Sequence, residues 1–313
     1  MRHALPVAFG GITLAVMALL GSGYARAQTS PQPAGWNVTD CLTCHENAAG
    51  DAFQRSAHAR QDQSCGTCHQ RVAEHAASQM AGQSGGPVPT VKTLKAREVN
   101  DSCLTCHEKN GQANYVSSMH DRRNVACTAC HGVHSYKSEK AQLKTTTVIE
   151  TCSTCHKAER AKSMRASHHP VREGRMGCTS CHNPHDGARP KMIRADSVNE
   201  LCYQCHTEKR GPYAFEHAPV REDCISCHEP HGTNHPRLLT QKLPNLCWNC
   251  HLSGSGHFGS GDNASTAQGV AVAPPGAPSG YPTVNSRFVG RSCRTCHVKI
   301  HGSNHPSGAF FVR

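Results

Sequence analysis

Large apolar side chains are scarce in this sequence. Hydrophobic residues make up 37% of its 313 residues and aromatic residues only 5%, which is thin for a chain of this length to bury an ordinary core. After residue 20 there is no apolar run long enough to cross a bilayer. The sequence also lacks a phosphate-binding loop, a dinucleotide fingerprint and a nucleophile elbow. These absences argue against enzymes built on those motifs and against an ordinary hydrophobic interior.

Cysteine, in contrast, is abundant, and all 20 cysteines fall in C-x-x-C-H motifs, which are therefore ten in number. In such a motif two thiols add to the vinyl groups of a c-type haem and the adjacent histidine binds the iron. Disulfides and zinc sites do not explain a histidine after every second cysteine. We therefore predict ten covalently bound haems c, numbered 1 to 10 along the chain. Their attachment cysteines are, in order, Cys41 and Cys44, Cys65 and Cys68, Cys103 and Cys106, Cys127 and Cys130, Cys152 and Cys155, Cys178 and Cys181, Cys202 and Cys205, Cys224 and Cys227, Cys247 and Cys250, Cys293 and Cys296. The proximal iron ligands are, in the same order, His45, His69, His107, His131, His156, His182, His206, His228, His251 and His297.

The scarcity of apolar residues agrees with haem as the interior of the fold. Ten flat porphyrins supply the missing apolar faces, and the polypeptide wraps around them. We expect a multihaem cytochrome c of mostly irregular coil with short α-helices, arranged around a quasi-linear chain of ten haems with little or no β-structure. Folding should depend on haem insertion, because metal binding and folding are coupled in small metalloproteins.

The N-terminus reads as a secretory signal peptide over residues 1–27. It has a short basic region, an apolar run from Ala4 to Leu20 and a small-residue site at Ala25-Arg26-Ala27 that would be cleaved before Gln28. An uncleaved membrane anchor is the alternative, although the run is short for a span. We expect residues 28–313 to form an exported, periplasmic protein.

The basic net charge of the chain changes once the cofactor is counted. The formal charge of +11 includes Arg2 and Arg26, so the mature chain carries +9. Each haem adds two propionates to an iron porphyrin of charge +1 when ferric and 0 when ferrous, so ten haems bring the total to about −1 or about −11. Nucleic acid is therefore not an expected partner, and the lysines and arginines are expected to pair with propionates.

The ten motifs fall into five pairs, which predict five two-haem modules. Similar phrases open the pairs: VTDCLTCH, VNDSCLTCH, VIETCSTCH, VNELCYQCH and LPNLCWNCH. Two stretches rich in small and polar residues, about 78–97 and 259–288, read as loop insertions. The modules span about residues 38–100, 101–148, 149–198, 199–243 and 244–313.

Each module carries two further histidines, one between its motifs and one after the second motif. We call them the middle and the trailing histidine and predict that they are the distal ligands, one for each haem. Methionine, which competes for this role, is not found at repeating positions. The middle histidines are His58, His120, His168, His217 and His257, and the trailing ones are His75, His134, His185, His231 and His301.

Three histidines remain outside this count. The shared phrase PVRE aligns His168, and not His169, with His217, so we interpret His169 as a bystander. His235 and His305 share the phrases HGTNHP and HGSNHP. Either could replace its upstream neighbour, His231 or His301.

Chain reach restricts which haem a trailing histidine can serve. The three residues from His131 to His134 span at most about 10 Å, too little to pass around a porphyrin rim. His134 should therefore bind a neighbouring haem, and such crossed ligation would join adjacent modules. A middle histidine can reach either haem of its own pair, so its assignment stays open.

Bis-histidine ligation leaves no iron position for substrate, and we identify no catalytic residue. Electron transfer is the function that these residues support. Because modules that contact only their neighbours stack in a line, we expect the order of the haems in space to follow their order in sequence.

Ten motifs in five pairs and the ending GRSCRTCHVKIHGSNHPSG resemble the MtrA-type decahaem cytochromes, with their DmsE and PioA branches. The resemblance implies a periplasmic wire inside an outer-membrane β-barrel of MtrB type, where it exchanges electrons with periplasmic electron-transfer proteins and with a cell-surface cytochrome or extracellular metal. A soluble periplasmic shuttle or electron store is the alternative, and a multihaem reductase has less support. The direction of electron flow, which in this family serves either metal reduction or Fe(II) oxidation, stays open.

Overall fold

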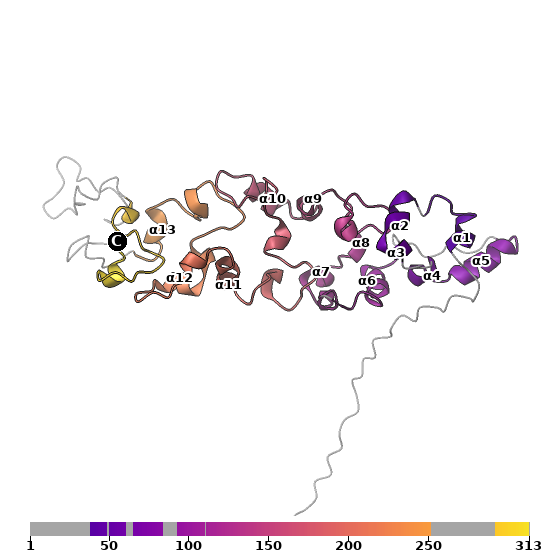
Figure 1. Ribbon diagram of the computed structural model, residues 1–313, viewed down its shortest axis with the longest axis horizontal. Helices are drawn as coiled ribbons and strands as arrows, with labels where there is room; N and C mark the ends of the chain where they lie inside the picture. The colour runs from indigo at the N-terminus through magenta and orange to yellow at the C-terminus, as the bar shows by residue number, and fades with distance from the viewer. Residues whose placement is uncertain are drawn as a thin grey trace, which may run out of the picture.

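The computed structural model describes residues 38–48, 50–60, 65–83, 93–109, 111–251 and 292–312. All attachment cysteines lie in these ranges, whereas the predicted signal peptide and the 259–288 insertion lie outside them. The chain forms an elongated body whose N-terminal helices, α1 to α5, lie at one end and whose last helix, α13, lies near the other (Figure 1).

Short helices joined by irregular coil make up the described chain. Its β-pairing consists of isolated bridges, with no named strand among the described residues. This confirms the predicted fold class of coil with short helices. The α-helices are α1 (Val38–Leu42), α2 (Asp51–Arg55), α3 (Ala57–Arg60), α4 (Cys65–Cys68), α5 (Val72–Met80), α6 (Ala96–Leu104), α7 (Met119–Arg122), α8 (Cys127–Cys130), α9 (Val148–Ser153), α10 (Lys157–Ser163), α11 (Val198–Tyr203), α12 (Ala218–Glu222) and α13 (Asn245–Trp248). The 3-10 helices are η1 (Ala113–Tyr115), η2 (Lys140–Gln142), η3 (Cys178–Ser180), η4 (Pro190–Met192), η5 (Thr207–Lys209), η6 (Cys224–Ser226), η7 (Pro236–Leu238), η8 (Cys293–Thr295) and η9 (Gly308–Phe310).

Two helices reach into the ends of the first predicted insertion, about 78–97. Helix α5 continues to Met80 and α6 begins at Ala96, while residues 84–92 lie outside the described residues. The run VAEHAASQM is helical because it contains several good helix formers and neither glycine nor proline. None of the helices in the described ranges has the length and apolar character needed to span a bilayer.

Local sequence explains how the first motif of a module is held on a helix. In α9 the Thr147 hydroxyl accepts a hydrogen bond from the Glu150 backbone N–H at 3.1 Å, and the Glu150 carboxylate accepts one from the Thr147 N–H at 3.3 Å. This is a capping box, which satisfies two backbone donors at the helix start. Ser197 caps α11 in a similar way, accepting from the Glu200 N–H at 3.1 Å. Each helix therefore begins at a defined residue and carries its first cysteine about one turn later.

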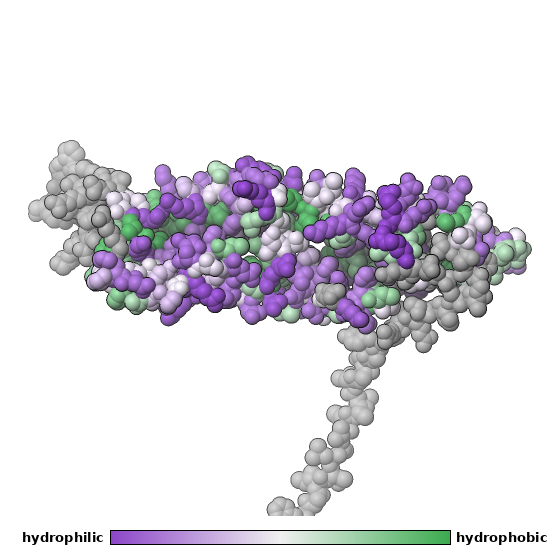
Figure 2. All heavy atoms as spheres, viewed as in Figure 1, coloured by the Kyte–Doolittle hydropathy of each residue, from purple (hydrophilic) through white to green (hydrophobic). Residues whose placement is uncertain are grey.

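The interior of the molecule is hollow rather than filled by side chains. The buried hydrophobic residues of the described chain are only Val99, Tyr115, Met192, Ile193 and Ala195. A continuous cavity of about 4270 Å³ runs between the helices, several times the roughly 300–1,000 Å³ of an ordinary ligand pocket. Polar side chains cover much of the visible outer face, with apolar ones showing between them (Figure 2). The cavity has the scale required for several large cofactors.

A buried asparagine joins the two motifs within the second and fourth modules. The Asn100 side-chain oxygen accepts a hydrogen bond from the Cys127 backbone N–H at 2.7 Å. In the fourth module, Asn199 accepts from the Cys224 N–H at 2.8 Å and donates to the carbonyls of Val220 and Arg221 at 3.0 and 2.9 Å. The start of the second motif is thereby fixed against the helix that carries the first.

Backbone contacts join consecutive modules. Ser167 of the third module pairs with Thr233 of the fourth in an isolated antiparallel bridge. Phe215 of the fourth module pairs in the same way with Ser303 of the fifth. Gly232 has a φ of +139°, and a Cβ there would collide with the carbonyl oxygen of Lys162. This glycine therefore permits the close approach of one module to the next.

Candidate functional site

Histidine rings in the described chain face one another in twos. Nine of the ten proximal histidines each have a second histidine ring opposite, with ring centroids about 6 Å apart. The pairs are His45 and His75 (6.0 Å), His58 and His107 (6.0 Å), His69 and His134 (5.9 Å), His120 and His156 (6.1 Å), His131 and His185 (5.9 Å), His169 and His206 (6.3 Å), His182 and His231 (6.2 Å), His217 and His251 (6.1 Å), and His228 and His301 (6.2 Å).

This separation fits one iron between each pair of rings. A metal–imidazole bond of roughly 2 Å plus a ring radius of about 1 Å on each side places the centroids of two axial ligands about 6 Å apart. Direct ring contact would bring them closer, and unrelated surface histidines would not share one distance. The residues present therefore fit bis-histidine haem iron, with the C-x-x-C cysteines at hand to hold each porphyrin.

The pairing follows a simple rule along the chain. A middle histidine faces the proximal histidine of the first motif in the next module, as His120 faces His156. A trailing histidine faces the proximal histidine of the second motif in the previous module, as His185 faces His131. Consecutive modules thus exchange one histidine in each direction.

The pair of His134 and His69 agrees with the limit set by chain reach. His134 lies opposite a histidine of the preceding module rather than opposite His131, and its Nδ1 contacts the Ala48 carbonyl oxygen at 2.6 Å. At the N-terminal end no earlier module exists in the described chain, and the trailing His75 faces His45 within its own module. His257, the fifth middle histidine, lies outside the described residues.

In the third module the histidine that faces a proximal ring differs from the predicted one. His169, and not His168, lies opposite His206. His168 points elsewhere: its Nδ1 contacts the Arg165 carbonyl oxygen at 2.6 Å and its Nε2 contacts the Glu173 carboxylate at 3.0 Å. Hydrogen bonds from His168 and then Arg172 lower the pKa of Glu173 to about 2. Both ring nitrogens of His168 are thus already engaged.

A different sequence signal would have identified His169. Ser56 and Ser118 are buried serines that each stand two residues before a middle histidine. Ser167 has the same position relative to His169, and its bridge to the next module matches the one that Phe215 forms. The triplets are Ser56-Ala57-His58, Ser118-Met119-His120 and Ser167-His168-His169. The PVRE alignment failed because the spacing differs: Pro170 directly follows His169, whereas one residue separates His217 from Pro219.

His235 and His305 do not take the place of His231 and His301 opposite a proximal histidine. His231 and His301 are the residues that face proximal histidines. The backbone of His235 bonds with the Thr233 hydroxyl, and the Nδ1 of His305 accepts from the Ser307 N–H at 3.1 Å.

Backbone carbonyls orient the proximal histidines of the second motifs. The Nδ1 atoms of His131, His182 and His228 lie 2.6, 2.9 and 2.8 Å from the carbonyl oxygens of Ala141, Lys191 and Arg237. Those three residues have backbone φ values of +60°, +53° and +59°, which residues other than glycine rarely adopt. A carbonyl can only accept, so Nδ1 carries the proton and Nε2 is left for iron.

Two middle histidines, His120 and His169, are held by the loop that supplies the trailing histidine of the next module. The Nδ1 of His120 lies 3.3 Å from the Pro184 carbonyl oxygen, and that of His169 lies 2.8 Å from the Pro230 carbonyl oxygen. Each of these prolines directly precedes a trailing histidine. The two histidines that adjacent modules exchange are therefore oriented by one shared contact.

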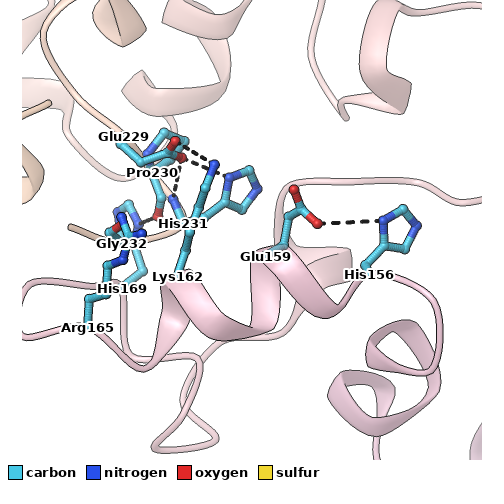
Figure 3. A network of polar contacts seen from close by, with 9 residues as sticks. All are labelled: His156, Glu159, Lys162, Arg165, His169, Glu229, Pro230, His231 and Gly232. Atoms are coloured by element: carbon cyan, nitrogen blue, oxygen red, sulfur yellow. Dashed lines mark hydrogen bonds and ion pairs between the residues drawn. The ribbon is translucent and has the colours of Figure 1, made fainter.

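A carboxylate contacts the trailing histidine of the fourth module (Figure 3). Glu229 accepts from the Lys162 ammonium at 2.9 Å through Oε2, and its Oε1 lies 3.0 Å from the His231 Nδ1. Burial alone would raise the pKa of Glu229, but the hydrogen bonds from Lys162 and His231 lower it below the usual value. Glu229 is therefore ionised at neutral pH.

Burial keeps several distal imidazoles neutral. It lowers the pKa of His58, His185 and His217, with a further contribution from the proximal ring that each faces. Burial, and then the charge of Lys209, lower the pKa of His301 to about 4. The neutral imidazole is the form that binds a metal ion.

Neighbouring cysteine sulfurs trace a continuous row of motifs. Within modules, the first cysteines of the two motifs interact, as when the Cys103 thiol donates a hydrogen bond to Cys127, which raises the pKa of Cys103 and lowers that of Cys127. Between modules, burial and then the nearby Cys106 raise the pKa of Cys68. The other contacts within modules join Cys41 to Cys65, Cys152 to Cys178, Cys202 to Cys224 and Cys247 to Cys293. Between modules the influence is electrostatic, and it links Cys130 to Cys155, Cys181 to Cys205 and Cys227 to Cys250. The motifs therefore succeed one another in sequence order.

Comparison with known proteins agrees with this organisation. The family model for a doubled CXXCH motif matches residues 120–161, 168–211 and 217–256. The multiheme cytochrome MtrA of Shewanella baltica (strain OS185) is 36% identical in an alignment that covers 95% of this chain and 86% of that protein.

Proposed function

The chain belongs to the MtrA family of multihaem cytochromes, electron-transfer proteins with covalently bound haem c, and we propose that it conducts electrons along a row of ten bis-histidine haems. The observation that carries this proposal is the set of nine histidine pairs with centroids 5.9 to 6.3 Å apart.

Each pair supplies the two axial ligands of one haem. Haems 1 to 9 then take His75, His134, His58, His185, His120, His231, His169, His301 and His217 as distal ligands. The pairing rule leaves His257 for haem 10, whose proximal ligand is His297. Histidine on both sides favours a low reduction potential, because a methionine ligand raises it.

The haems supply one-electron redox chemistry, and the polypeptide holds them in order. Cysteine interactions, by hydrogen bond within modules and electrostatic between them, show that each motif lies near the one before it and the one after it. Crossed ligation ties every inner module to both neighbours, so the spacing between haems cannot change without loss of an iron ligand.

We also propose where in the cell the row of haems transfers electrons. The basic start, apolar run and A-x-A site of residues 1–27 support export to the periplasm. A polypeptide with this polar outer face (Figure 2) cannot face lipid directly, so crossing the outer membrane requires a housing such as an MtrB-like β-barrel. At the far end the row would meet a cell-surface cytochrome or extracellular metal.

Isolation of the protein from its own host tests whether it acts as a transmembrane conduit or as a soluble shuttle. A C-terminally tagged chain is purified from outer membranes solubilised in mild detergent, and the proteins that remain bound in stoichiometric amount are identified. One barrel protein bound in equal amount supports the conduit. Recovery from the periplasmic fraction alone, with no barrel, would favour the soluble shuttle.

The haem count and ligation need a separate measurement. The intact mass of the mature protein gives the number of attached haems, expected to be ten. Near-infrared magnetic circular dichroism then distinguishes bis-histidine from histidine–methionine iron. Fewer than ten haems, or a methionine-ligated fraction, would refute this part of the proposal.

A further inference from the structure

The trailing histidine of the fourth module has a distinct contact. His231 lies opposite His182 with ring centroids 6.2 Å apart and planes inclined by only 8°. Its Nδ1 contacts the Glu229 carboxylate at 3.0 Å, whereas the distal histidines His120 and His169 contact neutral backbone carbonyls. On the other side of the same iron position, the His182 Nδ1 contacts the Lys191 carbonyl oxygen.

The sequence repeats this position with other residues. The residue two places before the trailing histidine is Ala73, Gly132, Asn183, Glu229 and Lys299 in modules one to five. Asn183 shows which part of the contact is structural, because its side-chain oxygen accepts from the His185 backbone N–H at 3.2 Å. Glu229 makes the same backbone contact to His231 at 3.2 Å. The carboxylate charge at the ring is therefore additional to the fold of the loop.

Lys162 restrains the carboxylate from the preceding module. Its ammonium contacts Oε2 at 2.9 Å, while Oε1 takes both contacts with His231 (Figure 3). The Glu229 side chain is 25% exposed and that of Lys162 31% exposed, so water screens the ion pair only in part. Glu229 is thereby fixed with one oxygen directed at a distal ligand.

A carboxylate behind a metal-bound histidine makes the imidazole more basic. A more basic ligand donates more charge to iron and stabilises the oxidised state over the reduced one. We infer that Glu229 lowers the reduction potential of haem 6, and that Lys162 opposes this effect. The inference rests on the proposed ligation of haem 6 by His182 and His231.

The position of haem 6 gives this effect a consequence for conduction. It is the sixth of ten haems, so electrons entering at either end must pass it. Haem 6 then holds an electron less readily than it would without Glu229. Glu229 therefore raises the energy of an electron at a point in the row that every electron must pass.

Potentiometric titration of the full holoprotein tests the inference with Glu229→Gln, which keeps the size of the side chain and removes its charge. We expect the ratio of reduced to oxidised haem 6 to rise about tenfold at a fixed solution potential, which is an upward shift of 59 mV for a one-electron couple. The change should be confined to about one tenth of the absorbance amplitude. Lys162→Met should move the same component in the opposite direction.

Two further variants separate tuning from a general charge or folding effect. Glu173→Gln removes a carboxylate that contacts His168, which is not a proposed ligand, and should leave the titration unchanged. In a His231→Met background the Nδ1 contact is gone, so Glu229→Gln should no longer shift haem 6.

The outcomes also distinguish failure of this inference from failure of the proposed function. If ten bis-histidine haems are present by magnetic circular dichroism and Glu229→Gln moves no component by more than threefold in ratio, the inference is overturned. An equal shift in Glu173→Gln would overturn it as well. A missing bis-histidine haem in the unmodified protein would instead refute the proposed ligation.

Discussion

Asn199 joins the two haem motifs of the fourth module, and replacing it with leucine, a residue of similar size, tests that joint. Asn199 is 8% exposed and makes three hydrogen bonds, to the Cys224 N–H and to the carbonyls of Val220 and Arg221. A hydrogen bond in a folded protein contributes about 1 kcal/mol net. The variant should therefore lose about 3 kcal/mol of local stability.

Hydrogen exchange measures this loss where it occurs. The polypeptide stays covalently attached to its haems when it unfolds, so a global two-state unfolding experiment does not apply. Exchange of the Cys224 amide reports local opening instead. Because about 1.4 kcal/mol corresponds to a tenfold change, peptides covering residues 222–228 should exchange about a hundredfold faster in Asn199→Leu.

A control variant and a loading check make the result interpretable. Asn234 is exposed in the loop after the second motif, and Asn234→Leu should leave exchange at residues 222–228 unchanged. Intact mass must show the same number of haems in all proteins. Exchange of the Asn199→Leu peptides within threefold of the parent would refute the view that this side chain holds the second motif in place.

Three further predictions follow from the site and the packing. His169→Ala should open the distal side of one haem and produce a high-spin signal of about one tenth of total haem in electron paramagnetic resonance, whereas His168→Ala should not; the reverse result would restore His168 as the ligand opposite His206. Gly232→Ala should destabilise the contact between the third and fourth modules by roughly 1–3 kcal/mol, because its Cβ would collide with the Lys162 carbonyl oxygen at φ +139°, and limited proteolysis should then cut between these modules sooner than in the parent. Expression without haem attachment should give a chain with little helical circular dichroism and rapid proteolysis, because the cavity of about 4270 Å³ has no side chains to fill it; a protease-resistant apoprotein would contradict this.

The crossed ligation that we propose would explain how so short a polypeptide can organise a long row of haems. Each inner module lends its middle histidine forward and its trailing histidine backward, as His120 and His134 do. Neither module can complete its iron sites alone. The stability of each module interface is therefore tied to haem binding, in place of the apolar contacts that this chain lacks.

The sequence by itself determined the chemistry of this protein. Covalent attachment requires two cysteines and a histidine within five residues, so C-x-x-C-H is a local signal that needs no folded structure. The same holds for the coil-rich fold, since low hydrophobic content excludes an ordinary core. The one-for-one count of extra histidines was likewise visible without coordinates.

Only the tertiary structure decided which histidine faces which. Either iron lay within chain reach of a middle histidine, and the structure directed His58, His120, His169 and His217 to the following module. The choice between His168 and His169 depended on a bridge from Ser167 to a loop 66 residues away. Sequence spacing limits how far a side chain can reach, but the partner it meets depends on how separate modules pack, which no local pattern encodes.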